Sequence, residues 1–214
     1  MRLVLPRLYV ILDASLITAS ERDCALDLAE AGVRLLQYRN KSAPAKRYLE
    51  SSRELAQTLC PRGVSFFVND RPDVAFLTGA NGVHVGQDDL EVEQARQVLG
   101  SDKLVGVSTH NLSQFERAAK SSADYIAVGP IYATSSKTNP DPVVGVDFLR
   151  RVRALTDKPI VAIGGITLDR AAAVIEAGAD SVAVISGILN APDPGERAKQ
   201  YLNTLEAAKH AAAV

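Results

Sequence analysis

The chain has 214 residues, 47% of them apolar, which is enough to bury the core of one substantial domain. Its 24 basic and 25 acidic residues give a formal net charge of −1, which excludes a global field that would draw the chain to nucleic acid or to an anionic membrane. Recognition of an anion must therefore be local.

The amino-terminal segment and the two cysteines predict a cytoplasmic protein. Pro6 and Arg7 interrupt the apolar amino terminus, and no signal-peptide cleavage site follows it. No apolar run reaches the roughly 18 residues of a membrane span. Cys24 and Cys60 have no metal-ligand spacing and are typical of free thiols in a reducing compartment. The sequence leaves the oligomeric state open.

Short β-branched runs alternate with helical patterns along the whole chain. The predicted strands are Leu8–Leu12, Val33–Gln37, Val64–Val68, Gly82–Val85, Leu104–Val107, Tyr125–Val128, Ile160–Ile163 and Ser181–Ile185. The predicted helices are Glu21–Ala31, Ala45–Leu59, Arg71–Thr78, Val92–Leu99, Leu112–Ser121, Val146–Leu155, Leu168–Ala177 and about Pro194 to Lys209. Strict alternation predicts a single (β/α)8 TIM barrel, a catalytic domain over residues 1–214.

The joints between helix and strand favour this repeated βα unit. Gly32, Gly79 and Gly178 each follow a predicted helix, where glycine readily adopts the left-handed conformation that ends it. The alternative is an open, doubly wound sheet, whose glycine fingerprint would follow the first strand. Asp13-Ala14-Ser15 stands there instead, so we favour the closed barrel.

Long polar side chains follow the second predicted strand, at the rim where TIM barrels place their active sites. Gln37, Arg39 and Lys41 alternate, so in extended chain their side chains face one way. Arginine offers a bidentate fork and lysine a point charge, a combination that suits phosphate. The alternative interpretation is a solvated rim that binds no substrate.

Two carboxylates follow the next two strands. Asp70 and Asp89 would meet at neighbouring strand ends, where they could share one Mg²⁺ that binds a phosphate. Asp88 is a competing ligand, because the sequence does not show which of the pair points inward. Alternatively, Asp70 and Asp89 each cap the helix that follows.

The later strand ends carry glycines and hydroxyls. Gly164-Gly165 and Ser186-Gly187 end the last two strands, where many barrels bind phosphate, although glycine also serves tight turns. The loop after the sixth strand, with Thr134, Ser136 and Lys137, would suit a lid or a passive surface loop.

The histidines and possible nucleophiles give weaker signals. His84 lies inside an apolar strand and is expected to be a packed core residue, and His110 has no identifiable acid partner. No Ser-His-Asp or Cys-His arrangement and no zinc-type cluster emerges. The candidate side chains favour stabilisation of a leaving anion over nucleophilic attack on a carbonyl.

In this order, these motifs resemble the thiamine-phosphate synthase (thiamine phosphate pyrophosphorylase) family over almost the whole barrel. The segments are QYRNK (37–41), FFVNDR (66–71), GVHVGQDDL (82–90), GVSTH (106–110), GPIYATSSK (129–137), AIGGI (162–166) and AVISGI (183–188). The resemblance implies a TIM barrel and an Mg²⁺-dependent transferase of thiamine biosynthesis. It would join an aminopyrimidinylmethyl diphosphate to a thiazole ethyl phosphate and release pyrophosphate, with loss of CO₂ from a carboxylated thiazole.

The resemblance also implies roles for individual residues. Asp70 and Asp89 would bind Mg²⁺. The pyrimidine diphosphate would contact Gln37, Arg39, Lys41, Asn69, Ser108 and Lys137, of which Arg39, Lys41 and Lys137 would be catalytic. The thiazole phosphate would contact Thr134, Ser136, Gly165, Ile185 and Ser186. Ala133 stands where the family has proline, so this loop departs from the family pattern.

The sequence leaves three other functions open. A thiazole-phosphate isomerase on a similar barrel would not need the acidic pair or the Gln-Arg-Lys set. A Schiff-base aldolase would need Lys41 or Lys137 to be desolvated. A non-catalytic metabolite-binding barrel would tolerate gaps among the metal and diphosphate residues, and the sequence shows none.

Overall fold

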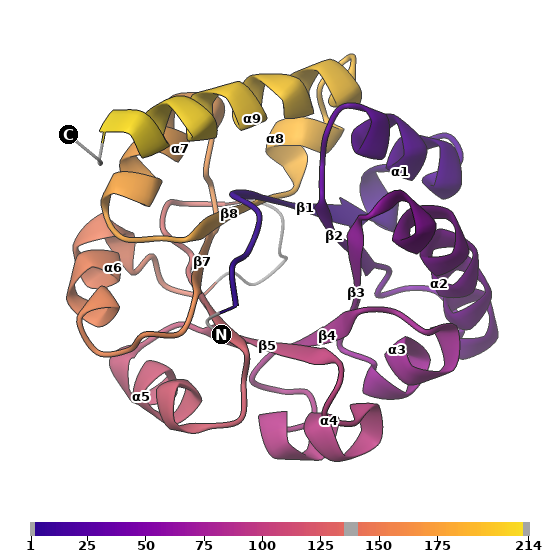
Figure 1. Cartoon of the computed structure of the whole chain (residues 1–214), viewed down its shortest axis with the longest axis horizontal. Helices are drawn as coiled ribbons and strands as arrows, with labels where there is room; N and C mark the ends of the chain where they lie inside the picture. Colours follow the sequence, from indigo (N-terminus) through magenta and orange to yellow (C-terminus); the bar gives the residue numbers. More distant parts are fainter. Residues whose placement is uncertain (1–2, 135–140, 212–214) are drawn as a thin grey trace.

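The computed structural model describes residues 3–134 and 141–211, and it confirms the TIM barrel. Eight parallel strands close in sequence order, with β8 paired to β1 (Figure 1). They are β1 (Leu8–Asp13), β2 (Leu35–Arg39), β3 (Ser65–Asn69), β4 (Gly82–Val85), β5 (Leu104–Thr109), β6 (Tyr125–Val128), β7 (Ile160–Ile163) and β8 (Ser181–Val184). Because all strands run in the same direction, their carboxyl ends meet at one mouth.

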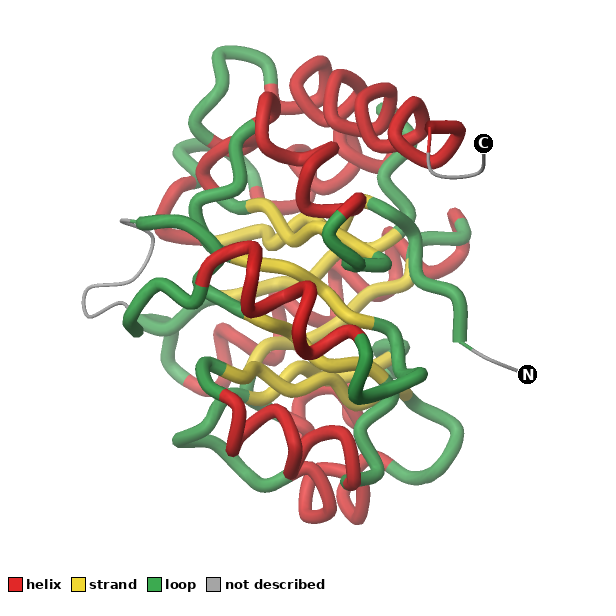
Figure 2. The backbone as a smooth tube through the Cα atoms, turned by 90° about the vertical axis from the view of Figure 1, so that its left-hand side faces the viewer, coloured by secondary structure: helices red, strands yellow, loops and turns green. Residues whose placement is uncertain are grey.

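Helices surround the sheet on all sides (Figure 2). They are α1 (Glu21–Glu30), α2 (Ala45–Leu59), α3 (Pro72–Thr78), α4 (Val92–Leu99), α5 (Leu112–Lys120), α6 (Gly145–Arg153), α7 (Leu168–Glu176), α8 (Ser186–Leu189) and α9 (Pro194–Ala211). Short 3₁₀ turns follow β1 (Ala14–Leu16) and α2 (Cys60–Arg62). The last helix, α9, packs against α7 and α1, and none of the described helices has the length and apolarity of a membrane span.

The hydrophobic core has two layers, as a closed barrel requires. The larger layer lies between the strands and the helices and includes Leu36, Phe66 and Leu149. A smaller cluster fills the barrel interior and includes Tyr9, Phe67 and Tyr125. The segment before β1 crosses the amino-terminal end of the barrel (Figure 1), where Leu5 is buried against this interior cluster.

A repeated polar contact ties the strands together in pairs near the amino-terminal end of the barrel. In three pairs, an Asn or Asp just before the even-numbered strand accepts a hydrogen bond from a backbone N–H at the start of the preceding odd-numbered strand. The bonds are Phe66 N to Asn81 Oδ1 at 2.9 Å, Val105 N to Asp124 Oδ2 at 2.7 Å and Ile160 N to Asp180 Oδ2 at 2.8 Å.

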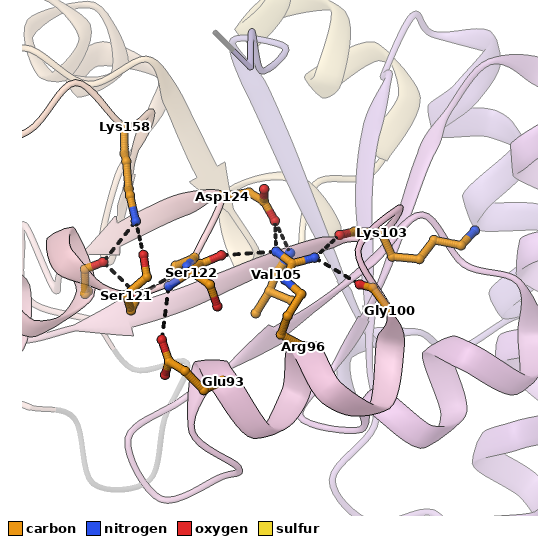
Figure 3. A network of polar contacts seen from close by, with 11 residues as sticks. Glu93, Arg96, Gly100, Lys103, Val105, Ser121, Ser122, Asp124 and Lys158 are labelled. Carbon is orange, nitrogen blue, oxygen red and sulfur yellow. Dashed lines mark hydrogen bonds and ion pairs between the residues drawn. The ribbon is translucent and has the colours of Figure 1, made fainter. Parts of the chain in front are cut away.

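Arginines from the helices complete two of these contacts. Arg96 of α4 ion-pairs with Asp124 and also donates to the backbone carbonyls of Gly100, Lys103 and Ser122 (Figure 3). Arg153 of α6 pairs with Asp180 in the same way, at 2.7 Å. These charged groups therefore have a structural role, at the end of the barrel opposite the mouth.

The predicted elements agree with the structure except at a few boundaries. β2 begins at Leu35, two residues later than expected, and runs to Arg39, so Gln37 and Arg39 lie within the strand. The short helix α8 was not predicted, because its four residues are too few to show a period.

Candidate active site

The first charged contact at the mouth joins β1 to β2. Asp13 and Arg39 are register partners at the carboxyl ends of these strands, and their side chains form an ion pair. The residue Asp13 is only 3% exposed, and its carboxylate also accepts hydrogen bonds from the backbone N–H and hydroxyl of Ser15. Asp13 therefore holds the Arg39 guanidinium at the mouth, and sequence reasoning missed this role.

The second contact brings together the ends of β2, β3 and β4. Lys41 Nζ lies 2.8 Å from Asp70 Oδ2, and the carboxyl group of Asp70 is near enough to that of Asp89 to raise the pKa of Asp89. Burial is the larger cause of this raised pKa, and the neighbouring Asp70 carboxyl group is the second. Two neighbouring carboxylates repel each other when both are ionised, and a bound cation would reduce that repulsion.

Neither of these carboxylates caps a helix, so the capping interpretation is wrong. The N-cap of α3 is Arg71, with no side-chain cap, and Asp70 has a positive φ of 62°. The N-cap of α4 is Glu91, whose capping box with Gln94 satisfies the helix start. Asp89 instead accepts a hydrogen bond from the backbone N–H of Gly86 at 2.7 Å, which turns its carboxylate back toward the mouth.

The donor set fits a hard cation that also binds substrate oxygens. Within the described residues, no group of three or more His, Cys, Asp or Glu side chains could form a complete protein cage for a metal. Mg²⁺ is commonly held by one or two carboxylates together with substrate phosphates, so the pair Asp70 and Asp89 is sufficient. Asp88 is exposed at the surface of the same loop.

A cavity of about 260 Å³ opens at the other half of the mouth, where β5 to β8 end. Its walls are mainly backbone, hydroxyls and apolar groups, and they include five of the predicted site residues. These are Ser108, Thr134, Gly165, Ile185 and Ser186. The predicted residues Ser136 and Lys137 lie outside the described part of the chain.

His110 has an acidic partner that sequence reasoning did not find. Its Nε2 lies 3.4 Å from Asp141 Oδ2, and its Nδ1 lies 2.6 Å from the carbonyl oxygen of Gly129. Both His110 and Asp141 line the cavity. The expectation that His110 lacks an acid was wrong because Asp141 lies thirty-one residues away in sequence, beyond the sixth strand.

The remaining predicted residues lie between the two halves of the mouth. Gln37 and Asn69 are buried in β2 and β3, and Ser108 lies in β5 on the cavity wall. The expectation that His84 is a buried residue is confirmed. It also contacts Ser108, with Nε2 2.9 Å from Oγ, so it connects β4 to the cavity.

Comparison with known proteins agrees with this geometry. The family model for thiamine monophosphate synthase matches residues 8–188. A thiamine-phosphate synthase of Koribacter versatilis is 52% identical over 208 residues, covering 95% of this chain and 97% of that protein. A thiamine-phosphate synthase of Chloroflexus aurantiacus is 44% identical, over 91% of this chain and 90% of that protein.

The chain belongs to the thiamine-phosphate synthase family. The solved structure of a thiamine phosphate pyrophosphorylase from Pyrococcus furiosus superposes with a TM-score of 0.86 at 31% identity, covering 95% of this chain and 96% of that one. The resemblance drawn from the strand-end motifs is thus confirmed. The chain is a thiamine-phosphate synthase-type transferase of thiamine biosynthesis.

Proposed function

We propose that the chain, acting as a single catalytic domain, transfers an aminopyrimidinylmethyl group from its diphosphate to a thiazole ethyl phosphate. The observation that carries this proposal is the division of the mouth. Asp70, Asp89, Arg39 and Lys41 gather at one half. At the other half lies a cavity lined mainly by backbone, hydroxyl and apolar groups, with the pair His110 and Asp141 on its wall. The first half suits a diphosphate with its metal, and the second suits a ring that carries a phosphate.

The reaction breaks the bond between the pyrimidine methylene carbon and the diphosphate oxygen, and pyrophosphate takes the electron pair. Asp70 and Asp89 would hold Mg²⁺, which neutralises charge on the departing pyrophosphate when bound. Arg39, fixed by Asp13, and Lys41 would contact the phosphate oxygens, together with Lys137. The electron-rich aminopyrimidine carries the resulting positive charge at its methylene.

The second half of the reaction forms the new bond. The nitrogen lone pair of the thiazole attacks the methylene carbon and completes the thiazolium product, so no protein nucleophile is needed. Thr134, Gly165, Ile185 and Ser186 on the cavity wall, together with Ser136, would hold the thiazole phosphate in line. Gln37, Asn69 and Ser108 would position the pyrimidine. A carboxylated thiazole would also lose CO₂.

The described lysines argue against the aldolase alternative. A Schiff-base lysine needs a desolvated amine, yet the Lys41 side chain is 59% exposed and ion-paired with Asp70. No lysine of the described residues is buried. Borohydride treatment with a carbonyl substrate is therefore expected to trap no adduct.

Metal removal tests the proposed chemistry directly. Pyrophosphate should appear only when the pyrimidine diphosphate and the thiazole phosphate are mixed with enzyme and Mg²⁺. It should disappear in excess EDTA and return when Mg²⁺ is restored. Full pyrophosphate release in chelator would contradict the metal site. Full release from the pyrimidine diphosphate without the thiazole phosphate would contradict the transfer.

Gly165→Ala should weaken binding of the thiazole phosphate. Gly165 has a φ of +61°, and an added Cβ would overlap the Ala133 carbonyl oxygen and lie 2.9 Å from Tyr132 Cβ. Left-handed strain of about 1–2 kcal/mol and displacement of this wall should raise the thiazole phosphate KM about tenfold or more, measured by steady-state kinetics.

A matched control separates the cavity wall from backbone strain. Gly79 has a similar φ of +72°, but an added Cβ would meet nothing within 4 Å. Gly79→Ala should lose stability and leave both KM values unchanged. Equal KM changes in the two variants would refute the role of Gly165 in the cavity.

A further inference from the structure

A continuous line of hydrogen bonds crosses the barrel interior beneath the mouth. Gln37 Nε2 donates to Tyr9 Oη at 2.8 Å, and Tyr9 Oη lies 3.0 Å from Tyr125 Oη. Tyr125 Oη is 2.9 Å from His84 Nδ1, and His84 Nε2 is 2.9 Å from Ser108 Oγ. We call these five residues the interior chain. Its five residues come from five strands, and it connects two residues with proposed substrate contacts, Gln37 and Ser108.

Packing locks the middle of the interior chain in place. The Tyr125 ring stacks on His84 with centroids 5.6 Å apart and meets Tyr9 edge-on at 6.1 Å. Gly106 makes room for it, because any Cβ there would overlap the Tyr125 ring. Burial raises the pKa of both Tyr9 and Tyr125, so each remains a hydroxyl that can donate.

The donor inventory gives the interior chain one direction. Tyr9 has a single hydroxyl proton, and because its oxygen already accepts from Gln37, its proton goes to Tyr125. The Tyr125 proton then goes to His84 Nδ1. A neutral histidine with Nδ1 as acceptor carries its proton on Nε2, which donates to Ser108 Oγ. If Tyr125 donated to Tyr9 instead, the Tyr9 oxygen would accept from both Gln37 and Tyr125. The buried Tyr9 hydroxyl proton would then have no acceptor within the interior chain.

We propose that the interior chain is a positioning device, in which Tyr9, Tyr125 and His84 set the donor and acceptor sense of its two ends together. In this state the Ser108 hydroxyl accepts from His84 and keeps its own proton to donate into the cavity. The inference rests on the proposed function, because it treats Gln37 and Ser108 as substrate contacts. It adds three interior residues, none of which needs to touch the substrate, to the set that determines the rate.

The tautomer of His84 tests the direction without any substrate. The chain contains three histidines, so its ¹⁵N-histidine NMR spectrum can be assigned with His84→Asn. We expect the wild type to hold His84 as the neutral Nε2–H tautomer alone. In Tyr125→Phe the spectrum should show that this tautomer is no longer the only one populated. A wild-type Nδ1–H tautomer, or no change in Tyr125→Phe, would overturn the proposal. Since no turnover is measured, failure here would be distinct from failure of the proposed transferase.

Kinetics test whether the effect passes through Ser108. Without the Tyr125 hydroxyl, Ser108 can donate to His84 instead of the substrate, so Tyr125→Phe should lower kcat/KM for the pyrimidine diphosphate about tenfold. In a Ser108→Ala background the same change should add no more than about twofold. A full tenfold effect in both backgrounds would mean a general packing defect and would refute positioning.

Thr109→Val is the matched control. Thr109 lies next to Ser108 on β5, is fully buried, and donates to the Ala127 carbonyl at 2.9 Å, outside the interior chain. This change also removes one buried hydroxyl bond, so it should lower thermal stability but leave both the His84 tautomer and kcat/KM unchanged. A kinetic loss equal to that of Tyr125→Phe would contradict the proposal.

Discussion

Asp89→Asn is expected to lower kcat by about 10²–10³-fold, the size of effect seen when one group that stabilises transition-state charge is removed. Asparagine keeps an oxygen that can accept from the Gly86 N–H, so the loop conformation should persist. What is lost is one of two charges proposed to hold Mg²⁺. The measurement is the rate of pyrophosphate release at saturating substrate over a series of Mg²⁺ concentrations, where the apparent Mg²⁺ affinity should fall as well.

Asp88→Asn is the matched control for this charge. Asp88 is the adjacent residue and carries the same charge, but it lies exposed. Its replacement should change kcat by no more than about twofold, as is usual for a surface site away from the chemistry. If Asp88→Asn instead had the larger effect, the metal would be assigned to the wrong member of the pair.

Arg39→Ala should cost about 10²–10³-fold in kcat by the same argument, because it removes a fixed cation from the departing diphosphate. It also leaves Asp13 buried without its partner, so the folded state should lose stability. Arg39→Lys keeps the charge but not the bidentate fork, so its kcat should lie between those of the wild type and Arg39→Ala. Single-turnover kinetics with both substrates bound would measure the chemical step directly.

Two variants separate catalysis from folding in this experiment. Asp13→Asn should reduce kcat less than Arg39→Ala, because the guanidinium is present but less firmly held. Arg150→Ala removes an exposed guanidinium that pairs with Asp147 on α6 and should leave kcat unchanged. An Arg39→Ala enzyme within tenfold of wild type would sink the proposed role.

Much of the fold could be predicted, because the signals that specify it are local. Helix and strand periods, and glycines such as Gly32 and Gly178 at positive φ, lie within short segments. The predicted start of β2 at Val33 was wrong, because Arg34 is exposed in a run of apolar residues and only pairing with β1 and β3 shows that the strand begins at Leu35.

The candidate site was predictable where one residue type at a strand end already indicates its chemistry. Asp70 and Asp89 are brought together simply because β3 and β4 are neighbours. The residues that were missed depend on register and packing between strands. Asp13 became a partner of Arg39 only through pairing of β1 with β2, and Tyr125 enters the interior only because Gly106 lies opposite it. Such contacts leave no periodic trace in the sequence.

The most direct test of the account is a crystal structure with Mg²⁺ and pyrophosphate. We expect the ion on Asp70 and Asp89 and the pyrophosphate oxygens on Arg39 and Lys41, all at the carboxyl-terminal mouth of the barrel. An ion bound through Asp88 alone, or pyrophosphate bound away from this mouth, would contradict the central claim that one cluster of charges neutralises the leaving group.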